Sequence, residues 1–253
     1  MKRTTFTWLV TGTIALSACA SHYQLAGVER SRILIDSTYD AHPDEQAAAF
    51  MAPFKHRVDS MMSPVVGSLA RYMAAVRPES PLSNLMADIL LWTGKAYQEH
   101  PDFAVYNMGG MRAAFSKGPV TYGDVLDVAP FENKICFLTL KGDKVLELFR
   151  EMASVGGEAV SHGVNLVITK DYKLKSASLN GKPIDPQADY RVATLDYLAQ
   201  GNDKMVAFKA KTNVVSPQNT ENNVRFLIIN YFREQTAQGK VVDSEVEGRI
   251  VVE

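Results

Sequence analysis

Cysteine is scarce in this chain, which has only two among its 253 residues, Cys19 and Cys136. Cys19 directly follows an N-terminal leader and precedes the folded part, so one cysteine is left for the folded part. A single thiol cannot build a disulfide framework or a cysteine-based zinc site, which excludes the disulfide-stapled and zinc-knuckle classes of protein. Cys136 lies in an apolar run at residues 134–138, and we interpret it as a small buried hydrophobic residue.

An excess of charge of either sign is also missing. The chain has 27 basic and 28 acidic residues, and neither kind forms a long block. Bulk electrostatics therefore gives no reason to expect a nucleic acid or a charged membrane surface as a partner. The length is enough to bury the core of one domain, or at most of two small ones.

No apolar run is long enough to cross a bilayer, but the first residues have the layout of an export signal. Lys2 and Arg3 precede an apolar stretch at residues 8–16, and the small residues Ser17 and Ala18 stand before Cys19. We therefore expect a signal peptide at residues 1–18.

The four residues Leu16-Ser17-Ala18-Cys19 resemble the bacterial lipobox. The resemblance implies cleavage before Cys19, lipidation of Cys19, and a mature protein anchored to a bacterial membrane on its periplasmic or cell-surface face. The alternative is an ordinary secretory signal with a chance cysteine. Residues 19–42 would then form a lipidated tether, with a first strand at residues 32–35.

From residue 43 onward, helical periodicity alternates with strand patterns. Predicted helices begin at Asp44, at Asn84 behind a Ser83 cap, at Thr121, after Gly142 and near Asn222; the first carries an apolar stripe (Ala47, Phe50, Met51, Phe54, Val58 and Met61) that we expect to lie on a core. Predicted strands lie at 103–106, 134–140, 164–169, 190–195 and 249–252, and Asn180-Gly181 joins two more in a hairpin. We expect an α/β (α+β complex) domain over residues 43–253, with a mixed sheet and flanking helices.

One loop carries the first chemical signal. Asn107-Met108-Gly109-Gly110-Met111-Arg112 follows the apolar strand 103–106, so its glycines let the backbone approach a ligand and Arg112 offers a fork of donors for an anion. Taken alone, a Gly-Gly turn after a strand is more often plain loop geometry than an anion site.

Two further loops, at 130–133 and 196–203, also leave or precede predicted strands. If the three loops share one edge of the sheet, Phe131 and Tyr197 can clamp a planar heterocycle, an interaction worth about 1–3 kcal/mol per stacked base. Asp203 can accept hydrogen bonds from the hydroxyls of a sugar. Taken alone, each aromatic residue is better explained as a half-buried packing residue.

The order and spacing of these motifs resemble the C-terminal domain of the bacterial and animal 5′-nucleotidase (UDP-sugar hydrolase) family. The resemblance runs from Glu79-Ser80-Pro81 to Gly248-Arg249-Ile250 and includes Thr121-Tyr122-Gly123-Asp124, Pro130-Phe131-x-Asn133, Tyr190-Arg191-Val192-Ala193-Thr194 and Gly201-x-Asp203. It implies the fold of that domain and a role in binding substrate.

The resemblance also implies roles for single residues. The family's glycine loop meets the phosphate and ribose region, two aromatic residues sandwich the base, and a late aspartate holds the ribose. By position, the substrate-binding residues would be Asn107, Gly109, Gly110, Arg112, Phe131, Asn133, Tyr197 and Asp203, with Arg77 as the nearest candidate for an arginine that family members carry before Glu79.

Two departures from the family pattern matter. Gly201-Asn202-Asp203-Lys204 stands where the family has glycines beside the aspartate, so a bulkier loop can narrow or alter the ribose site. The family's metallophosphatase domain has no counterpart here: Asp40-Ala41-His42 resembles its first metal motif, but no Gly-Asn-His-Asp or Gly-His-x-His follows, and a solvated turn explains these residues better. Phosphoester hydrolysis in the family depends on two metal ions.

We therefore expect the nucleotide- or nucleoside-binding half of a split 5′-nucleotidase, acting in nucleotide catabolism. This chain would contribute no catalytic residue, metal or other cofactor, and a separate metallophosphatase chain would carry the divalent metals. The alternatives are a non-catalytic nucleoside- or nucleotide-binding lipoprotein that serves scavenging or sensing, and a structural lipoprotein that keeps the fold without the site.

Overall fold

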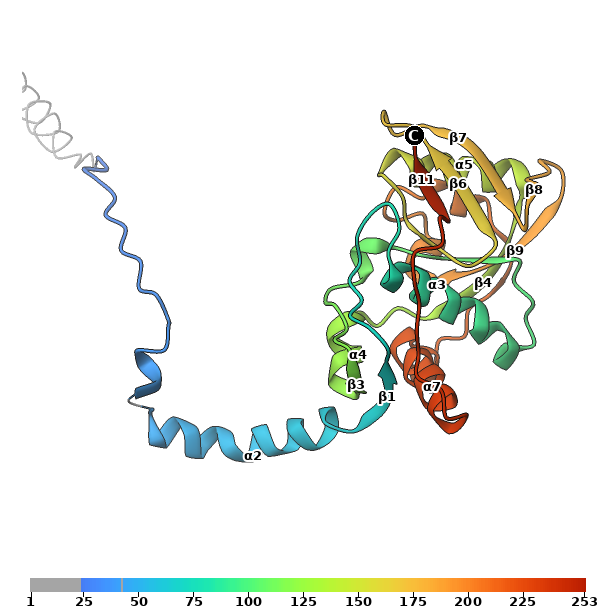
Figure 1. The fold of residues 1–253 in the computed structure, drawn as a ribbon. Helices are drawn as coiled ribbons and strands as arrows, with labels where there is room; N and C mark the ends of the chain where they lie inside the picture. The colour runs from blue at the N-terminus through green and yellow to red at the C-terminus, as the bar shows by residue number, and fades with distance from the viewer. Residues whose placement is uncertain (1–23, 42) are drawn as a thin grey trace, which may run out of the picture. The chain divides into compact units, whose positions relative to one another are not determined.

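The structure is a computed structural model that describes residues 24–41 and 43–253 (Figure 1). The predicted signal peptide at residues 1–18 and the predicted lipidation site Cys19 lie outside the described residues. The contacts within the chain divide it into two units, residues 1–51 and 52–253. In the part of the chain that is described, no helix combines the length and the apolar character that a membrane span requires.

The described part of the first unit contains little regular structure. Residues 24–35 form neither helix nor strand, so the strand predicted at 32–35 is wrong. Its apolar side chains Ile33, Leu34 and Ile35 are exposed, because no described strand pairs with this segment. The short η1 (Tyr39–Ala41) follows, and the carboxylate of Asp44 then accepts hydrogen bonds from the first backbone N–H groups of α2 (Glu45–Met62).

The apolar stripe of α2 does not lie on a core, which corrects the sequence-based expectation. None of its residues is buried, and Met51, Val58 and Met61 are all more than half exposed. Helical spacing shows only that these side chains share one face of a helix. It does not show what, if anything, covers that face.

The second unit is built around a five-stranded mixed sheet with the order β10-β4-β9-β2-β5. Its strands are β2 (Phe103–Tyr106), β4 (Ile135–Lys141), β5 (Ala159–Val160), β9 (Asp189–Leu195) and β10 (Thr212–Val215). β2 and β9 run parallel, and every other neighbouring pair is antiparallel. All residues of β2, and residues 135–140 of β4, are buried, so both faces of these strands are covered.

The mixed sheet expected from the sequence is confirmed, and two smaller sheets complete the unit. β1 (Val65–Leu69) pairs with β3 (Gly118–Thr121), and a four-stranded sheet has the order β11-β6-β7-β8. Its strands are β6 (Val164–Ile168), β7 (Leu174–Leu179), β8 (Lys182–Pro183) and β11 (Ile250–Val252). The hairpin predicted at Asn180-Gly181 is confirmed, and both residues have the positive φ that a two-residue turn requires.

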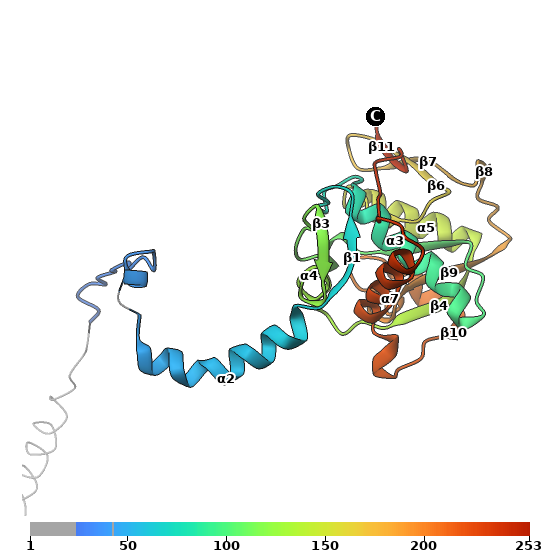
Figure 2. The ribbon, with the colours of Figure 1, turned by 60° about the horizontal axis from the view of Figure 1, so that its bottom comes forward.

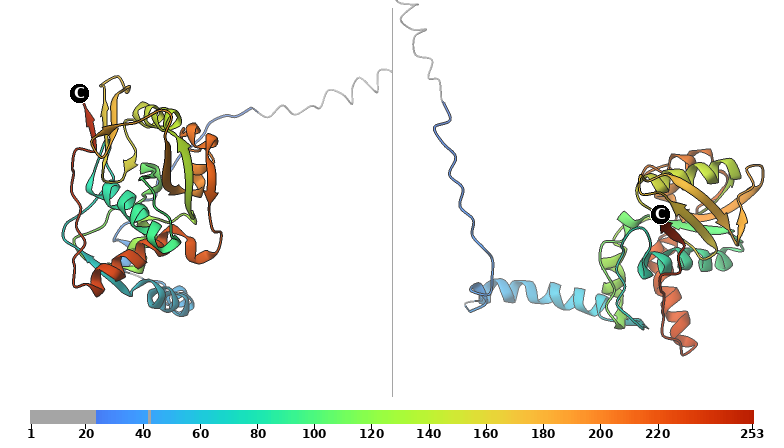
Figure 3. Two further views of the ribbon diagram at one scale, coloured as in Figure 1. Left: turned by 90° about the vertical axis from the view of Figure 1, so that its right-hand side faces the viewer. Right: turned by 45° about the horizontal axis from the view of Figure 1, so that its top comes forward.

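Helices flank these sheets, as the predicted fold class requires. α3 (Pro81–Thr93) packs on β2 and β5, α5 (Gly142–Ser154) on β4, β9 and β7, and α7 (Val224–Ala237) on β1 and α3 (Figure 2). α7 and the β7–β8 hairpin lie at opposite ends of the unit (Figure 3). The shorter helices are η2 (Gly94–Tyr97), η3 (Met108–Gly110), α4 (Tyr122–Val128), α6 (Asp196–Ala199), η4 (Val206–Ala210) and η5 (Thr220–Asn222).

The start of α3 differs from the sequence-based prediction. The helix begins three residues earlier, at Pro81, and its cap is Ser80 instead of Ser83. The Ser80 hydroxyl accepts a hydrogen bond from the Ser83 N–H, and the Ser83 hydroxyl accepts one from the Ser80 N–H. Proline suits the first helical position because its φ is already helical and its missing N–H would be unpaired there anyway.

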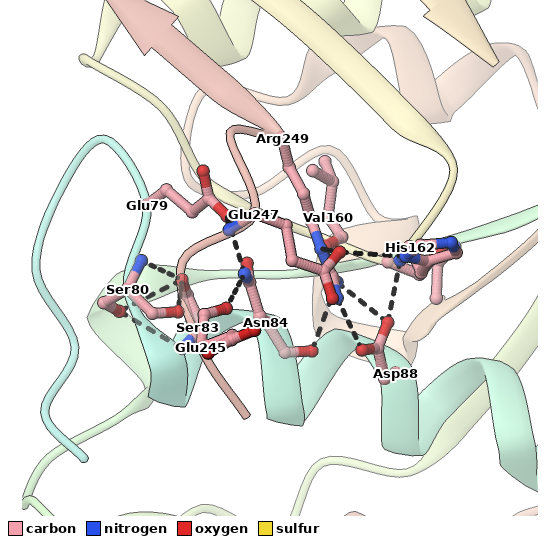
Figure 4. A network of polar contacts seen from close by, with 12 residues as sticks. Glu79, Ser80, Ser83, Asn84, Asp88, Val160, His162, Glu245, Glu247 and Arg249 are labelled. Atoms are coloured by element: carbon pink, nitrogen blue, oxygen red, sulfur yellow. Dashed lines mark hydrogen bonds and ion pairs between the residues drawn. The ribbon is translucent and has the colours of Figure 1, made fainter. Parts of the chain in front are cut away.

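A buried arginine ties the end of the chain to α3. Arg249 is 2% exposed and precedes β11. Its guanidinium donates to both oxygens of Asp88 on α3 (2.8 and 2.7 Å), to Glu247 (3.0 Å) and to the carbonyl oxygen of Val160 in β5 (2.9 Å) (Figure 4). One side chain therefore links the large sheet, the four-stranded sheet and α3.

We predict that Arg249→Met lowers the free energy of unfolding by about 2 kcal/mol, because it removes the buried guanidinium that pairs with Asp88 and donates to the Val160 carbonyl oxygen, while Asp88 itself is 34% exposed and stays partly hydrated. Urea denaturation of the purified protein measures this. Arg71→Ala is the matched control: its ion pair with Asp243 is more than 40% exposed on both sides, so its loss should cost less than about 1 kcal/mol. Equal, small losses for both variants would show that the buried network is not a stability determinant.

Candidate functional site

The strand order brings the three predicted loops to one edge of the large sheet. β2 and β9 are parallel, so their carboxyl ends lie at the same edge, where residues 107–112 and 196–203 begin. β4 is antiparallel to β9, and the pairing of Ile135 with Leu195 places the beginning of β4, and residues 130–133 before it, at that edge too. Ligands commonly bind beyond the carboxyl ends of parallel strands.

A cavity of about 380 Å³ lies among these loops. Seven of the nine residues predicted to bind substrate line it: Asn107, Gly109, Arg112, Phe131, Asn133, Tyr197 and Asp203. The remaining two, Gly110 and Arg77, do not. The volume is within the lower part of the range usual for small-molecule sites.

The two glycines of the first loop have different positions. Gly109 is exposed at the cavity, and a Cβ added to it would meet nothing within 4 Å. Gly110 is buried behind the loop, where a Cβ would lie 2.5 Å from Oδ1 of Asn107 and 3.0 Å from the ring of Tyr106. Gly109 thus leaves space in the cavity, whereas Gly110 leaves space for the Asn107 side chain.

Asp203 is the centre of a hydrogen-bonded group in the cavity. One of its carboxylate oxygens accepts from the Asn107 amide (2.5 Å), and the other accepts from the Tyr197 hydroxyl (2.9 Å). This hydrogen bond to Asp203 raises the pKa of the Tyr197 phenol, because only the protonated phenol can donate. The group joins residues from two of the three loops.

The backbone of Asp203 and Lys204 is left-handed, with φ of 53° and 65°. Aspartate tolerates this region, but a lysine is strained there where glycine is not. Lys204 therefore adopts a backbone conformation that suits glycine, although it is not a glycine.

The loop that carries Phe131 is anchored from both sides. The Asn133 carbonyl oxygen accepts from the Val224 N–H at the start of α7 (2.9 Å), and Arg225 donates to the Pro130 carbonyl oxygen (2.6 Å). On the opposite side, Asp196 accepts from the N–H groups of Lys134 and Tyr197. Phe131 and Tyr197 nevertheless remain 48% and 37% exposed, so both rings keep surface for a ligand.

Arg77 is directed elsewhere. It lines a second cavity with Lys170 and Tyr172, and its Nε donates to the Gly157 carbonyl oxygen (2.8 Å). Its guanidinium also pairs with Glu158. Among the residues that line the first cavity, the charged side chains are therefore Arg112 and Asp203.

Glu158 was missed by the sequence analysis although it contacts the glycine loop. It is 3% exposed and accepts hydrogen bonds from the Met108 N–H and from Arg77. Burial raises the pKa of its carboxyl group, while the Met108 N–H and Arg77 act in the opposite direction. A charged residue directly before the buried Ala159–Val160 pair of β5 was the available signal.

The described residues do not fit a metal centre: within 24–41 and 43–253, no group of three or more His, Cys, Asp or Glu side chains could hold an ion. The cavity instead offers two aromatic faces, a cation, a carboxylate and amide groups. Those groups suit the binding of a polar, planar molecule, and we derive no hydrolytic step from them.

Known proteins match this chain over most of the second unit. The family model of the 5′-nucleotidase C-terminal domain matches residues 65–210. Protein UshA of Yersinia enterocolitica is 29% identical over 169 residues, which make up 66% of this chain and 31% of UshA. A cell wall protein of Listeria monocytogenes is 25% identical over 240 residues, covering 85% of this chain and 30% of that protein.

A solved structure agrees with these matches. The crystal structure of a 5′-nucleotidase precursor from Thermus thermophilus matches with a TM-score of 0.71 at 26% identity, over 84% of this chain and 44% of that chain. The chain spans less than a third of the length of the two relatives and less than half of the solved chain. Since the family model covers more than half of the sequence, the chain belongs to the 5′-nucleotidase C-terminal domain family.

Proposed function

We propose that this chain binds a nucleotide or nucleoside in the cavity at the edge of the large sheet. The observation that carries the proposal is the convergence of Phe131, Tyr197, Asp203 and Arg112 from three separate loops on one cavity. Two aromatic side chains give stacking faces for a base, and Asp203 keeps lone pairs for the hydroxyls of a ribose. Arg112 is exposed and offers donors to a phosphate.

We further propose that the chain is the substrate-binding half of a split 5′-nucleotidase, working in nucleotide catabolism with a separate metallophosphatase chain. Support comes from membership of the 5′-nucleotidase C-terminal domain family. The partner would carry the divalent metals that activate water and polarise the phosphoryl group.

The proposed location is the surface of a bacterial membrane, facing the periplasm or the exterior. The Leu16-Ser17-Ala18-Cys19 motif supports export and lipidation at Cys19. The cell wall protein among the relatives is consistent with an exported protein. Radioactive or mass-spectrometric detection of lipid on Cys19, and its loss in Cys19→Ala, tests the anchor.

A second candidate function is nucleoside scavenging or sensing without catalysis. The observation that favours it is that the described residues offer a binding cavity but no group of metal ligands. The two functions share the same ligand and differ only in the need for a partner. The split enzyme would be favoured if the gene has a neighbouring reading frame that encodes a metallophosphatase lacking this C-terminal domain.

We predict that Phe131→Ala and Tyr197→Ala each weaken the binding of adenosine by about 5- to 150-fold, since one stacked base face is worth about 1–3 kcal/mol. Calorimetry with adenosine, AMP and UDP-glucose measures the loss. Tyr72→Ala is the matched control, because Tyr72 is 63% exposed and lies outside the cavity. If Phe131→Ala, Tyr197→Ala and Arg112→Ala all bind as the wild type does, the cavity is not the binding site. That result would favour a structural lipoprotein that keeps the fold without the site.

The glycines of the first loop give an independent prediction. Gly109→Ala places a methyl group in the cavity, so ligand affinity should fall at least about tenfold while the free energy of unfolding stays within about 0.5 kcal/mol. Gly110→Ala should instead lower the free energy of unfolding, because its methyl group collides with Asn107 and Tyr106. Calorimetry and urea denaturation of both variants separate the two effects; a stable Gly109→Ala that binds normally contradicts the proposed site.

Enzyme assays decide between the two functions. We expect the purified chain alone to release no phosphate from AMP in the presence of Mg²⁺, Mn²⁺ or Zn²⁺. Mixing it with a candidate metallophosphatase chain should produce metal-dependent AMP hydrolysis that Phe131→Ala reduces. AMP hydrolysis by this chain alone, free of contaminants, would falsify the split-enzyme proposal.

A further inference from the structure

We propose that Glu158 is a positioning residue that holds the glycine loop in the conformation that presents Asn107 and Gly109 to the ligand. It would act from behind the cavity, by tying the Met108 N–H to the guanidinium of Arg77. The proposal rests on the proposed nucleoside-binding function, which assigns the cavity its ligand.

The pairing of β5 with β2 places Glu158 beside the loop. β5 and β2 are antiparallel, and Val160 pairs with Val105 and Ala159 with Tyr106. One residue further on in this register, Glu158 lies opposite Asn107, the first residue of the loop. Its Oε2 accepts from the Met108 N–H, and Met108 stands between Asn107 and Gly109, which both line the cavity. Glu158 itself does not line the cavity.

Arg77 holds the other oxygen of Glu158. Its guanidinium donates to Oε1, and its Nε donates to the carbonyl oxygen of Gly157 (2.8 Å). Gly157 has a φ of +106°, and a Cβ there would lie 2.8 Å from the Pro78 carbonyl oxygen. The backbone after Arg77 therefore packs directly on Gly157, which holds the guanidinium against Glu158.

The environment of Glu158 suits an anchor. The side chain is 3% exposed, and a buried carboxylate is costly unless its oxygens are hydrogen-bonded or paired with a cation. Both oxygens of Glu158 have such partners, so movement of the loop would remove the Met108 N–H and leave one oxygen of a buried carboxylate without its hydrogen bond. The loop consequently has one favoured position, and the ligand need not order it on binding.

The test uses Glu158→Gln, which keeps the shape of the side chain and removes its charge. We expect the Met108 amide hydrogen to exchange at least about tenfold faster, and the affinity for adenosine to fall about tenfold, equivalent to about 1.4 kcal/mol. Arg77→Lys, which keeps the charge but loses the guanidinium fork, should shift both readouts in the same direction.

Glu99→Gln is the matched control. Glu99 makes a two-point ion pair with Arg191, and both side chains are less than 20% exposed. Arg191 lies opposite Thr139 near the beginning of β9, whereas the cavity lies beyond the end of that strand. This variant loses a similar interaction, so it reports the effect of general destabilisation. It should leave Met108 exchange and adenosine affinity unchanged.

A double-mutant cycle separates positioning from a merely structural role. If Glu158 acts through the loop, Glu158→Gln should weaken adenosine binding much less in an Asn107→Ala background than in the wild type. Equal losses in both backgrounds, an equal loss in Glu99→Gln, or unchanged Met108 exchange in Glu158→Gln would each overturn the proposal. If the wild type binds none of the nucleosides, the proposed function fails, and Met108 exchange still decides whether Glu158 anchors the loop.

Discussion

The parallel pairing of β2 with β9 is the constraint on which the cavity depends. It sends residues 107–112 and 196–203 out of the same edge of the sheet, although the 83 residues 113–195 separate them in the chain. The antiparallel pairing of β4 then adds the loop that carries Phe131. All of β2, residues 135–140 of β4 and residues 192–195 of β9 are buried, so these strands form a rigid frame and the residues that line the cavity stand on loops anchored to it.

Hydrogen bonding within the cavity has a consequence for ligand recognition. Asp203 is already engaged by the Asn107 amide and the Tyr197 hydroxyl, so it is held in one orientation before any ligand arrives. A carboxylate oxygen can accept more than one hydrogen bond, so a sugar hydroxyl can donate to Asp203 without displacing these two donors. The aromatic ring of Tyr197 is fixed by the same bond, which reduces the entropy lost when a base stacks on it.

Local signals in the sequence were sufficient to predict the order of most elements, whereas the seven predicted residues that line the cavity were assigned through the resemblance to a family. The Asn180-Gly181 turn, the Thr121 cap and the apolar strands are examples. The errors concern contacts between distant residues. Periodicity in α2 does not reveal what covers the helix. Arg77 lies near a family motif, but its guanidinium pairs with Glu158, 81 residues away in the chain. The sequence signal at Glu158, a charged residue directly before the Ala159–Val160 strand, does not indicate which residue it contacts, because Met108 lies fifty residues away.

The position of Arg77 also bears on which part of a nucleotide the cavity can hold. With Arg77 paired to Glu158, the cavity lining contributes one positive side chain, Arg112, and one negative side chain, Asp203. Opposite charges of equal number give no net attraction for a polyanion, whereas two aromatic faces and a hydroxyl acceptor favour the base and the ribose. Arg112 is exposed and is the one cationic side chain that lines the cavity, so it is the group there that can pair with a phosphate. In the proposed split enzyme, this chain would therefore hold the nucleoside more firmly than the phosphate.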